Sequence, residues 1–303
     1  MSFSNKVRRE ICSAVSDNDK RFACLYGMLL FCRTLSPEHI CFQTESSISA
    51  EFFGLLFRSV FRYSPECREN HRKDNTVLYC YDIYDGSIID EVYRTYRFIN
   101  VRTINSEIIV TNSIGGFTAG IFLACGSVND PSKEYHLEFS VSGEVLAEEL
   151  TVLLRDIGVT ARTTLRRGQY IVYIKDSESI EDTLTFMGAQ NCTLEIMNVK
   201  IYKDVRNKAN RITNCDSANI DKVIKAATKQ IEDIRLIECT DGLDSLTAEL
   251  REVAELRLEN MDMSLQEIGE NLSVPISRSG VNHRFRKIAV IAENIRKGEI
   301  CEQ

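Results

Sequence analysis

The sequence lacks tryptophan, contains only four prolines among 303 residues, and has no apolar run approaching the roughly 20 residues of a membrane-spanning helix. None of its eleven cysteines forms a Cys-x-x-Cys pair, and their number is odd. Zinc fingers need closely spaced ligand pairs, and a disulfide framework normally needs an even count. These absences favour buried free thiols in a reducing compartment. The alternative is that one cysteine is reactive. Since no signal peptide is visible, we expect a soluble cytoplasmic protein without a membrane partner.

The net charge of −7 argues against a surface that binds nucleic acid throughout. The charge is unevenly distributed, however. Residues 274–298 contain six positive side chains and a single carboxylate, Glu293, which gives a local net charge of +5. A basic face on an acidic protein usually has an anionic partner.

Two stretches of the chain repeat each other in order. A shift of 93 residues relates the first matches, and a shift of 97 relates the later ones after a four-residue insertion. The matched pairs are Gly27 and Gly120, Cys32 and Cys125, His39 and His136, and Phe42 and Phe139. The extended segments 76–83 and 169–176 match at a shift of 93. The common order indicates an internal duplication.

Hydrophobic periodicity predicts the order α-β-β-α-β-β-α in each half. The predicted helices are 22–34, 48–62 and 86–96 in the first half, and 116–126, 143–157 and 177–187 in the second. The strands richest in β-formers are 39–44 and 135–141, and 161–175 reads as a hairpin that turns at Arg167-Gly168. A helical run over 210–237 follows, with apolar residues at helical spacing.

The segments LYGMLLFCR (25–33) and TAGIFLACG (118–126) place small residues on what we expect to be paired helices. Gly120 and Ala124 are four residues apart and permit close backbone contact, whereas Phe31, which matches Ala124, would loosen it. The segment resembles the signature helix of the LAGLIDADG homing endonucleases. In those enzymes two such helices form the interface, and an acidic residue just before the last glycine binds the catalytic metal.

The acid position of that signature corresponds to Cys32 in the first copy and to Cys125 in the second. A buried thiol does not replace the hard carboxylate oxygen that magnesium prefers. Without the metal, nothing activates water or stabilises the leaving oxygen of a phosphodiester. We therefore expect no catalytic residue, no metal and no cofactor. The alternative, a metal-dependent nuclease, predicts magnesium-dependent cutting of DNA.

The C-terminal segment has the pattern of a helix-turn-helix. A helix over 247–259 precedes a capping box, Ser264 to Glu267, that starts a second helix over 265–272 with Gly269 at a tight crossing. The turn at 273–276 breaks that helix, and Ser277 caps a third helix of about twenty residues. The turn lacks the usual glycine and is longer than the commonest form.

The third helix has two distinct faces. Its apolar stripe consists of Val281, Phe285, Ile288 and Ala292. The candidate DNA-binding residues are Ser277, Arg278, Ser279, Asn282, His283, Arg284, Arg286 and Lys287. We expect base contacts from Arg278, Ser279, Asn282, His283 and Arg286, with Arg284 and Lys287 nearer phosphates. The alternative is a basic amphipathic helix that faces solvent or a partner protein.

Five segments together are similar to the WhiA family: 117–139, 210–222, 254–260, 264–272 and 276–288. One departure is Met261, where the family usually has a proline. The resemblance implies an α+β fold, a duplicated, degenerate LAGLIDADG-like αββαββα domain followed by an all-α helix-turn-helix domain. The expected parts are repeat 1 at 1–112, repeat 2 at 113–190, a helical linker at 191–238 and the helix-turn-helix at 239–303.

The resemblance further implies a sequence-specific, nucleoid-associated regulator of transcription in sporulation or cell division. Its expected partners are double-stranded DNA and RNA polymerase or another transcription regulator. The alternative is a nucleoid-associated or protein-interaction scaffold that acts in cell division without direct control of transcription. In active LAGLIDADG relatives the equivalent strands form a saddle over DNA, so Arg162, Arg166 and Arg167 are expected to add backbone contacts. The duplicated domain has an alternative use as a platform for another protein.

Overall fold

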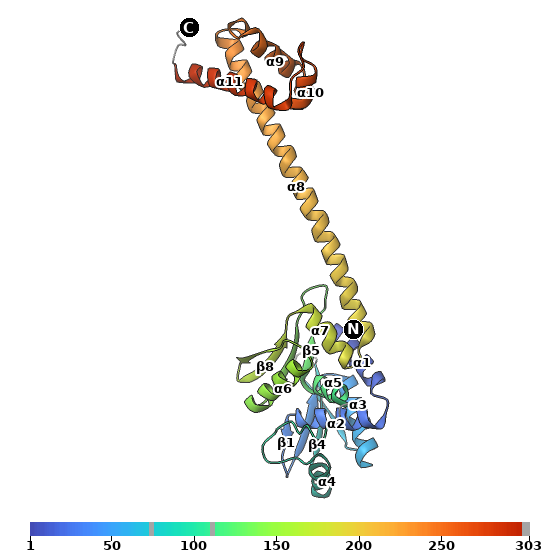
Figure 1. Cartoon of the computed structure of the whole chain (residues 1–303). Coiled ribbons are helices and arrows are strands. Elements are labelled where there is room, and N and C mark those ends of the chain that lie inside the picture. The colour runs from blue at the N-terminus through green and yellow to red at the C-terminus, as the bar shows by residue number, and fades with distance from the viewer. Residues whose placement is uncertain (73–75, 110–112, 299–303) are drawn as a thin grey trace. The chain divides into compact units, whose positions relative to one another are not determined.

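The computed structural model describes residues 1–72, 76–109 and 113–298 (Figure 1). These residues divide into two compact units, Met1–Asp204 and Val205–Gln303. The predicted boundary at residue 112 and the last five residues of the chain lie outside the described residues. Among the helices that are described, none is both long and apolar enough to cross a membrane.

The first unit contains two lobes with the predicted order of elements. Lobe 1 consists of α2 (Asn18–Leu30), β1 (Thr34–Leu35), β2 (Ile40–Thr44), α3 (Ser47–Phe61), β3 (Cys67–His71), β4 (Val77–Ile83) and α4 (Gly86–Tyr96). Lobe 2 consists of α5 (Ile114–Cys125), β5 (Gly126–Val128), β6 (Leu137–Val141), α6 (Glu144–Asp156), β7 (Arg162–Arg166), β8 (Gln169–Ile174) and α7 (Ser177–Phe186). A further helix, α1 (Phe3–Ala14), precedes both lobes and buries Val7 and Ile11. The predicted α-β-β-α-β-β-α duplication is thus confirmed.

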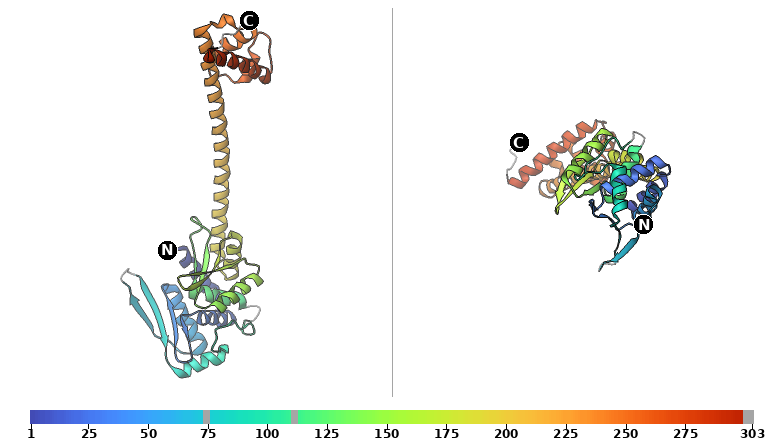
Figure 2. Two further views of the ribbon diagram at one scale, coloured as in Figure 1. Left: turned by 90° about the vertical axis from the view of Figure 1, so that its left-hand side faces the viewer. Right: turned by 90° about the horizontal axis from the view of Figure 1, so that it is seen from below.

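Each lobe has one antiparallel sheet (Figure 2). Each sheet has four strands, in the orders β1-β2-β4-β3 and β5-β6-β8-β7. In lobe 1 Phe42 pairs with Tyr81, whereas in lobe 2 the matching Phe139 pairs with Val172. The last matched strands are therefore related by a shift of 91, and the predicted shift of 93 is wrong by two residues. A two-residue offset escapes notice in the sequence because it leaves every side chain on the same face of its strand.

The seam between the lobes is the contact of α2 with α5. A Cβ atom on Gly27 would overlap the carbonyl oxygen of Phe117, and one on Gly120 would overlap that of Cys24. At the shift of 93, Gly27 matches Gly120 and Cys24 matches Phe117, so the two contacts are equivalent. The seam therefore has the pseudo-two-fold symmetry expected of a duplication. Gly116, which the sequence did not single out, extends the seam, because its Cβ would lie 2.9 Å from the carbonyl oxygen of Lys20.

The boundary between the two units falls within the helix α8 (Gln190–Thr240). This helix includes the predicted helical run 210–237. A 3-10 turn at Leu243–Ser245 follows it, and then α9 (Ala248–Glu259), α10 (Leu265–Glu270) and α11 (Arg278–Lys297). The predicted capping box is present at Ser264 and Glu267. Gly269 lies at the predicted crossing, where a Cβ atom would overlap the carbonyl oxygen of Ile276.

Candidate nucleic-acid interface

The start of α11 is fixed by local hydrogen bonding. Ser277 is in an extended conformation, and its hydroxyl accepts the backbone N–H of Gly280 at 3.3 Å. The exposed Pro275, two residues earlier, has no N–H to donate and excludes a continuous helix from α10 into α11. The first turn of α11 therefore begins at a defined residue, and Ser277 serves as its cap.

The two predicted faces of α11 are separated as expected. Val281, Phe285, Ile288 and Ala292 are each at most 4% exposed and pack into the core of the second unit. On the opposite face the side chains are solvent-exposed. That face carries Ser279, His283, Arg286 and Lys287, with the half-buried Asn282 beside them. We call these five residues the polar face of α11.

The remaining two arginines of the candidate set flank the polar face and differ in their surroundings. The side chain of Arg284 is only 16% exposed, and its guanidinium lies 3.7 Å from the carboxylate of Glu249. It also donates to the backbone carbonyl of Glu249 at 3.4 Å, so Arg284 links α11 to α9. Arg278 is exposed and lines a cavity of about 680 Å³ between α8 and the α9–α10 connection.

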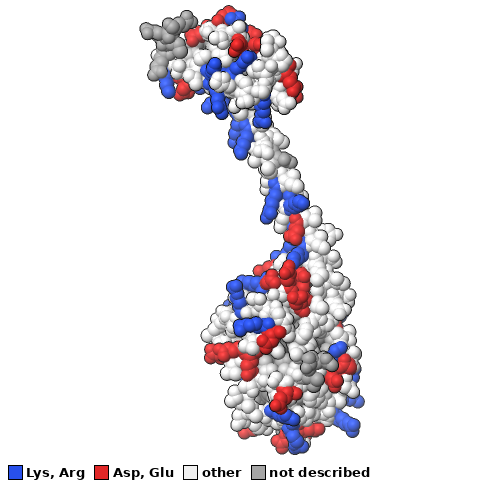
Figure 3. Space-filling model, in the orientation of Figure 1, with Lys and Arg blue, Asp and Glu red and all other residues white. Residues whose placement is uncertain are grey.

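Part of the positive charge counted in this segment is neutralised within the unit. Arg296 pairs with the buried Asp233 at 2.7 Å, and both Arg296 and Lys297 lie within 4 Å of the Glu293 carboxylate. The basic residues of the last turn are therefore engaged, whereas Arg286 and Lys287 remain exposed. Figure 3 shows several lysine and arginine side chains of this unit gathered on its visible face.

Arg257 supports the helix-turn-helix from inside, and the sequence analysis did not identify it. It is 2% exposed, and its guanidinium donates to the carbonyl oxygens of Met261 (3.2 Å) and Met263 (2.6 Å). The same group lies 5.4 Å from the centre of the Phe285 ring, a cation–π contact with α11. Burial lowers the pKa of this arginine below its ordinary value. Its spacing from the buried Val253 was the available signal, since residues four apart share one helical face.

A hydrogen bond from α9 also holds the connection between α10 and α11. The carboxylate of Glu252 on α9 accepts the backbone N–H of Ser273 at 2.5 Å. This hydrogen bond holds the pKa of Glu252 below its ordinary value of 4.5. Glu252 and Arg257 thus fix both connections of the helix-turn-helix to α9, which places the polar face of α11 on a rigid support.

The β7 arginines lie on the outer face of the lobe 2 sheet. The hydroxyl of Thr163 bonds with that of Thr151 on α6 at 2.8 Å, so Thr163 faces the helix. Because side chains alternate along a strand, Arg162 and Arg166 point to the other face, and both are exposed. Arg167 occupies the predicted turn with a φ of 51°, followed by Gly168 with a φ of 80°.

Cys32 and Cys125 come together at a cavity of about 780 Å³ between the two lobes. Burial raises the pKa of each thiol to about 12, so both are protonated at neutral pH. Arg8 of α1 also lines this cavity and donates to the carbonyl oxygen of Gly126, next to Cys125, at 2.8 Å. A guanidinium group therefore lies beside the C-terminal end of α5. Glu45 also borders the cavity, and its carboxylate pairs with Arg72 at 2.6 Å.

Comparison with known proteins agrees with this geometry. The model of the WhiA C-terminal HTH domain matches residues 209–292, and that of the WhiA LAGLIDADG-like domain matches residues 114–206. A "Probable cell division protein WhiA" from Clostridium perfringens is 36% identical over 321 residues, covering 98% of this chain and 99% of the relative. Its namesake from Carboxydothermus hydrogenoformans is 43% identical over 261 residues, covering 84% of this chain and 83% of the relative.

The crystal structure of full-length WhiA from Thermatoga maritima shares the fold. It superimposes with a TM-score of 0.59 at 24% sequence identity, covering 97% of this chain and 99% of that one. The first lobe lies outside both matched domain ranges, yet the Clostridium perfringens relative aligns over nearly the full length. The chain therefore belongs to the WhiA family.

Proposed function

We propose that the protein is a non-enzymatic, sequence-specific DNA-binding protein that regulates transcription in sporulation or cell division. The observation that carries the proposal is the division of α11 into a buried apolar stripe and an exposed polar face. A recognition helix needs this division, because one face must anchor it while the other reaches base edges in the major groove. The curated relatives are named as cell division proteins, which supports the cellular role.

Within this proposal, the residues that contact base edges are Arg278, Ser279, Asn282, His283 and Arg286. Arg286 is exposed on the polar face, and a guanidinium group is suited to a bidentate contact with guanine. Lys287 contacts phosphate, and Arg284 positions α11 through Glu249 while adding positive charge. The absence of catalysis is supported by the protonated thiols at Cys32 and Cys125, which are poor ligands for magnesium.

Substitution of Arg286 tests the proposal. The binding site is first located by footprinting full-length protein on chromosomal fragments, and affinity for that site is then measured at fixed salt concentration. We expect Arg286→Ala to lower affinity by about 1–3 kcal/mol and to relax preference at one base position. Lys297→Ala is the matched control, since it removes one positive charge from the last turn of the same helix. Equal affinity of the Arg286 variant and the wild type would rule out the assigned role.

A further inference from the structure

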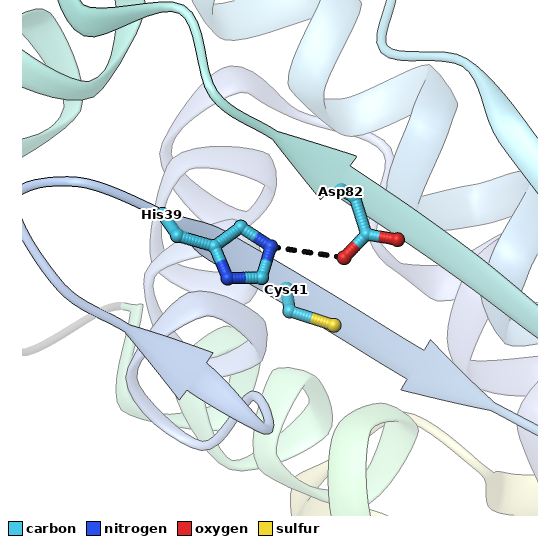
Figure 4. A group of neighbouring side chains, drawn as sticks. All are labelled: His39, Cys41 and Asp82. Carbon is cyan, nitrogen blue, oxygen red and sulfur yellow. Dashed lines mark hydrogen bonds and ion pairs between the residues drawn. The ribbon is translucent and has the colours of Figure 1, made fainter.

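Three different metal-ligand atoms meet on the sheet of lobe 1 (Figure 4). His39 directly precedes β2, Cys41 lies in β2, and Asp82 is the residue opposite Cys41 on β4. The imidazole nitrogen, the thiol sulfur and a carboxylate oxygen all lie within 4.8 Å of one another. The Nε2 atom of His39 is 2.9 Å from Oδ1 of Asp82.

The cluster lies on the face of the sheet that the helices do not cover. Phe42 stacks on Phe53 of α3 with ring centres 4.2 Å apart, which marks the covered face. Cys41 precedes Phe42 and therefore points to the other face. The side chains of His39 and Asp82 are 26% and 20% exposed, whereas Cys41 is only 4% exposed, so an ion from solvent reaches the thiol from the side of His39 and Asp82.

The histidine ring is already oriented. It stacks on the ring of Tyr84 with centres 4.3 Å apart and an interplanar angle of 2°. This contact restricts rotation of the imidazole and keeps Nε2 directed at Asp82. A ligand whose side chain is held in place by a neighbour loses less conformational entropy on binding an ion.

We propose that His39, Cys41 and Asp82 bind a zinc-class divalent transition metal. Zn²⁺ accepts sulfur, nitrogen and oxygen ligands together, whereas Mg²⁺ and Ca²⁺ bind oxygen ligands. Binding replaces the S–H proton of Cys41 with a metal–sulfur bond and releases that proton to solvent. Three protein ligands leave the fourth tetrahedral position to water or an external ligand.

Lobe 2 offers an internal comparison for this site. His136 matches His39, Glu138 takes the position of Cys41, and Tyr173 lies opposite Glu138 where Asp82 lies in lobe 1. His136 and Glu138 are 3.0 Å apart, so the histidine–carboxylate contact recurs. The thiol is replaced by a carboxylate, and the opposing carboxylate by a phenol. We therefore assign the metal site to lobe 1 alone.

The site borders the cavity between the lobes without lining it. None of its three ligands lines the cavity that contains Cys32 and Cys125, although the backbone N–H of Cys41 donates to the Cys32 thiol. The proposed ion is therefore bound on one sheet and ties β4 to the start of β2. It has no counterpart in the nuclease metal site, which lies at the ends of the paired helices.

The test uses full-length, reduced protein freed of metal with a chelator. Zn²⁺ is titrated in competition with a chromophoric chelator, and Co²⁺ is followed by its absorption spectrum. We expect one tightly bound equivalent and a thiolate-to-cobalt charge-transfer band. Cys41→Ser removes the band and weakens Zn²⁺ binding by more than about 100-fold. Loss of a residue that only hydrogen-bonds to a metal ligand weakens binding by up to about 100-fold, and loss of the ligand itself costs more. His39→Gln and Asp82→Asn also weaken binding and give independent tests should the serine variant not fold.

Two matched variants serve as controls. Cys80→Ser removes another buried thiol from the same sheet, and His136→Gln removes the corresponding histidine of lobe 2. Both retain the band and the affinity, and Zn²⁺ raises the melting temperature of both, as it does for the wild type. A band that persists in Cys41→Ser or disappears in Cys80→Ser would overturn the assignment. So would the lack of Zn²⁺ binding at micromolar concentrations.

Discussion

The two units of the molecule reach stability by different physical means. In the first unit, α2 and α5 meet backbone to backbone, and the decisive positions are those with no side chain, Gly27 and Gly120. In the second unit, a small helical core is supported by a buried guanidinium, that of Arg257, and by the buried carboxylate of Asp233. A small unit buries less apolar surface per residue, so hydrogen bonds from a few charged groups hold its connections.

Residues that stabilise the fold and residues proposed to bind DNA lie in different parts of the chain. The glycines of the seam, Gly27 and Gly120, are buried. In the second unit the polar face of α11 is exposed, and Arg257 beneath it contacts Phe285 of the same helix. Substitutions in the seam should therefore affect folding of the first unit, whereas those around α11 should affect binding or its support.

The largest effect is expected at the seam. Gly120→Ala places a methyl group on the carbonyl oxygen of Cys24, where only movement of a helix backbone relieves the overlap. We expect a loss of about 3 kcal/mol in the free energy of unfolding of the first unit. Urea unfolding followed by circular dichroism gives the loss, and hydrogen exchange in α2 and α5 assigns it to the seam. Gly143→Ala is the control, because a Cβ there meets nothing within 4 Å. Equal stability of the two variants would refute close packing.

A smaller effect is expected at the buried arginine. Arg257→Met keeps most of the side-chain volume but leaves the carbonyl groups of Met261 and Met263 without their donor. We expect the second unit to lose about 2 kcal/mol of stability. Arg251→Met makes the same chemical change on the same helix at a partly exposed ion pair with Asp244, and should cost about 0.5 kcal/mol. Thermal unfolding of the full chain compares the two, and a smaller loss at Arg257 than at Arg251 would contradict its structural role.

Local pattern and duplication made much of the fold predictable. The glycines at 27 and 120 pointed to the seam, and the capping box at Ser264 located the start of α10 within the sequence. The strand register was not predictable in the same way, because a shift of two residues preserves the alternation of faces. Register depends on ladder hydrogen bonds between strands that are far apart in the chain.

The candidate sites were also predictable only in part. The apolar stripe of α11 follows from helical spacing, and all four of its residues are buried. The engagement of Arg284 by Glu249 was not predictable, because it depends on how α9 packs against α11. The cluster of His39, Cys41 and Asp82 also escaped the sequence analysis, which sought closely spaced cysteine pairs. Asp82 joins the other two only through the pairing of β4 with β2.

The smallest effect addresses whether the first unit takes part in DNA binding. Arg162 and Arg166 are exposed on the outer face of the lobe 2 sheet, away from α6. If each neutralises one phosphate, replacing both with alanine lowers the slope of log affinity against log salt concentration by about two, because fewer counterions are released. The control is the pair Arg94→Ala and Arg155→Ala, which changes the net charge equally at exposed helical positions.

An unchanged slope in the Arg162 and Arg166 variant would mean that neither side chain contacts phosphate. That outcome would favour the alternative use of the first unit as a platform for a protein partner. A slope reduced by two in that variant, and not in the Arg94 and Arg155 control, would instead make DNA binding a property of both units. The measurement separates these outcomes because the salt slope counts phosphate contacts and is insensitive to base readout.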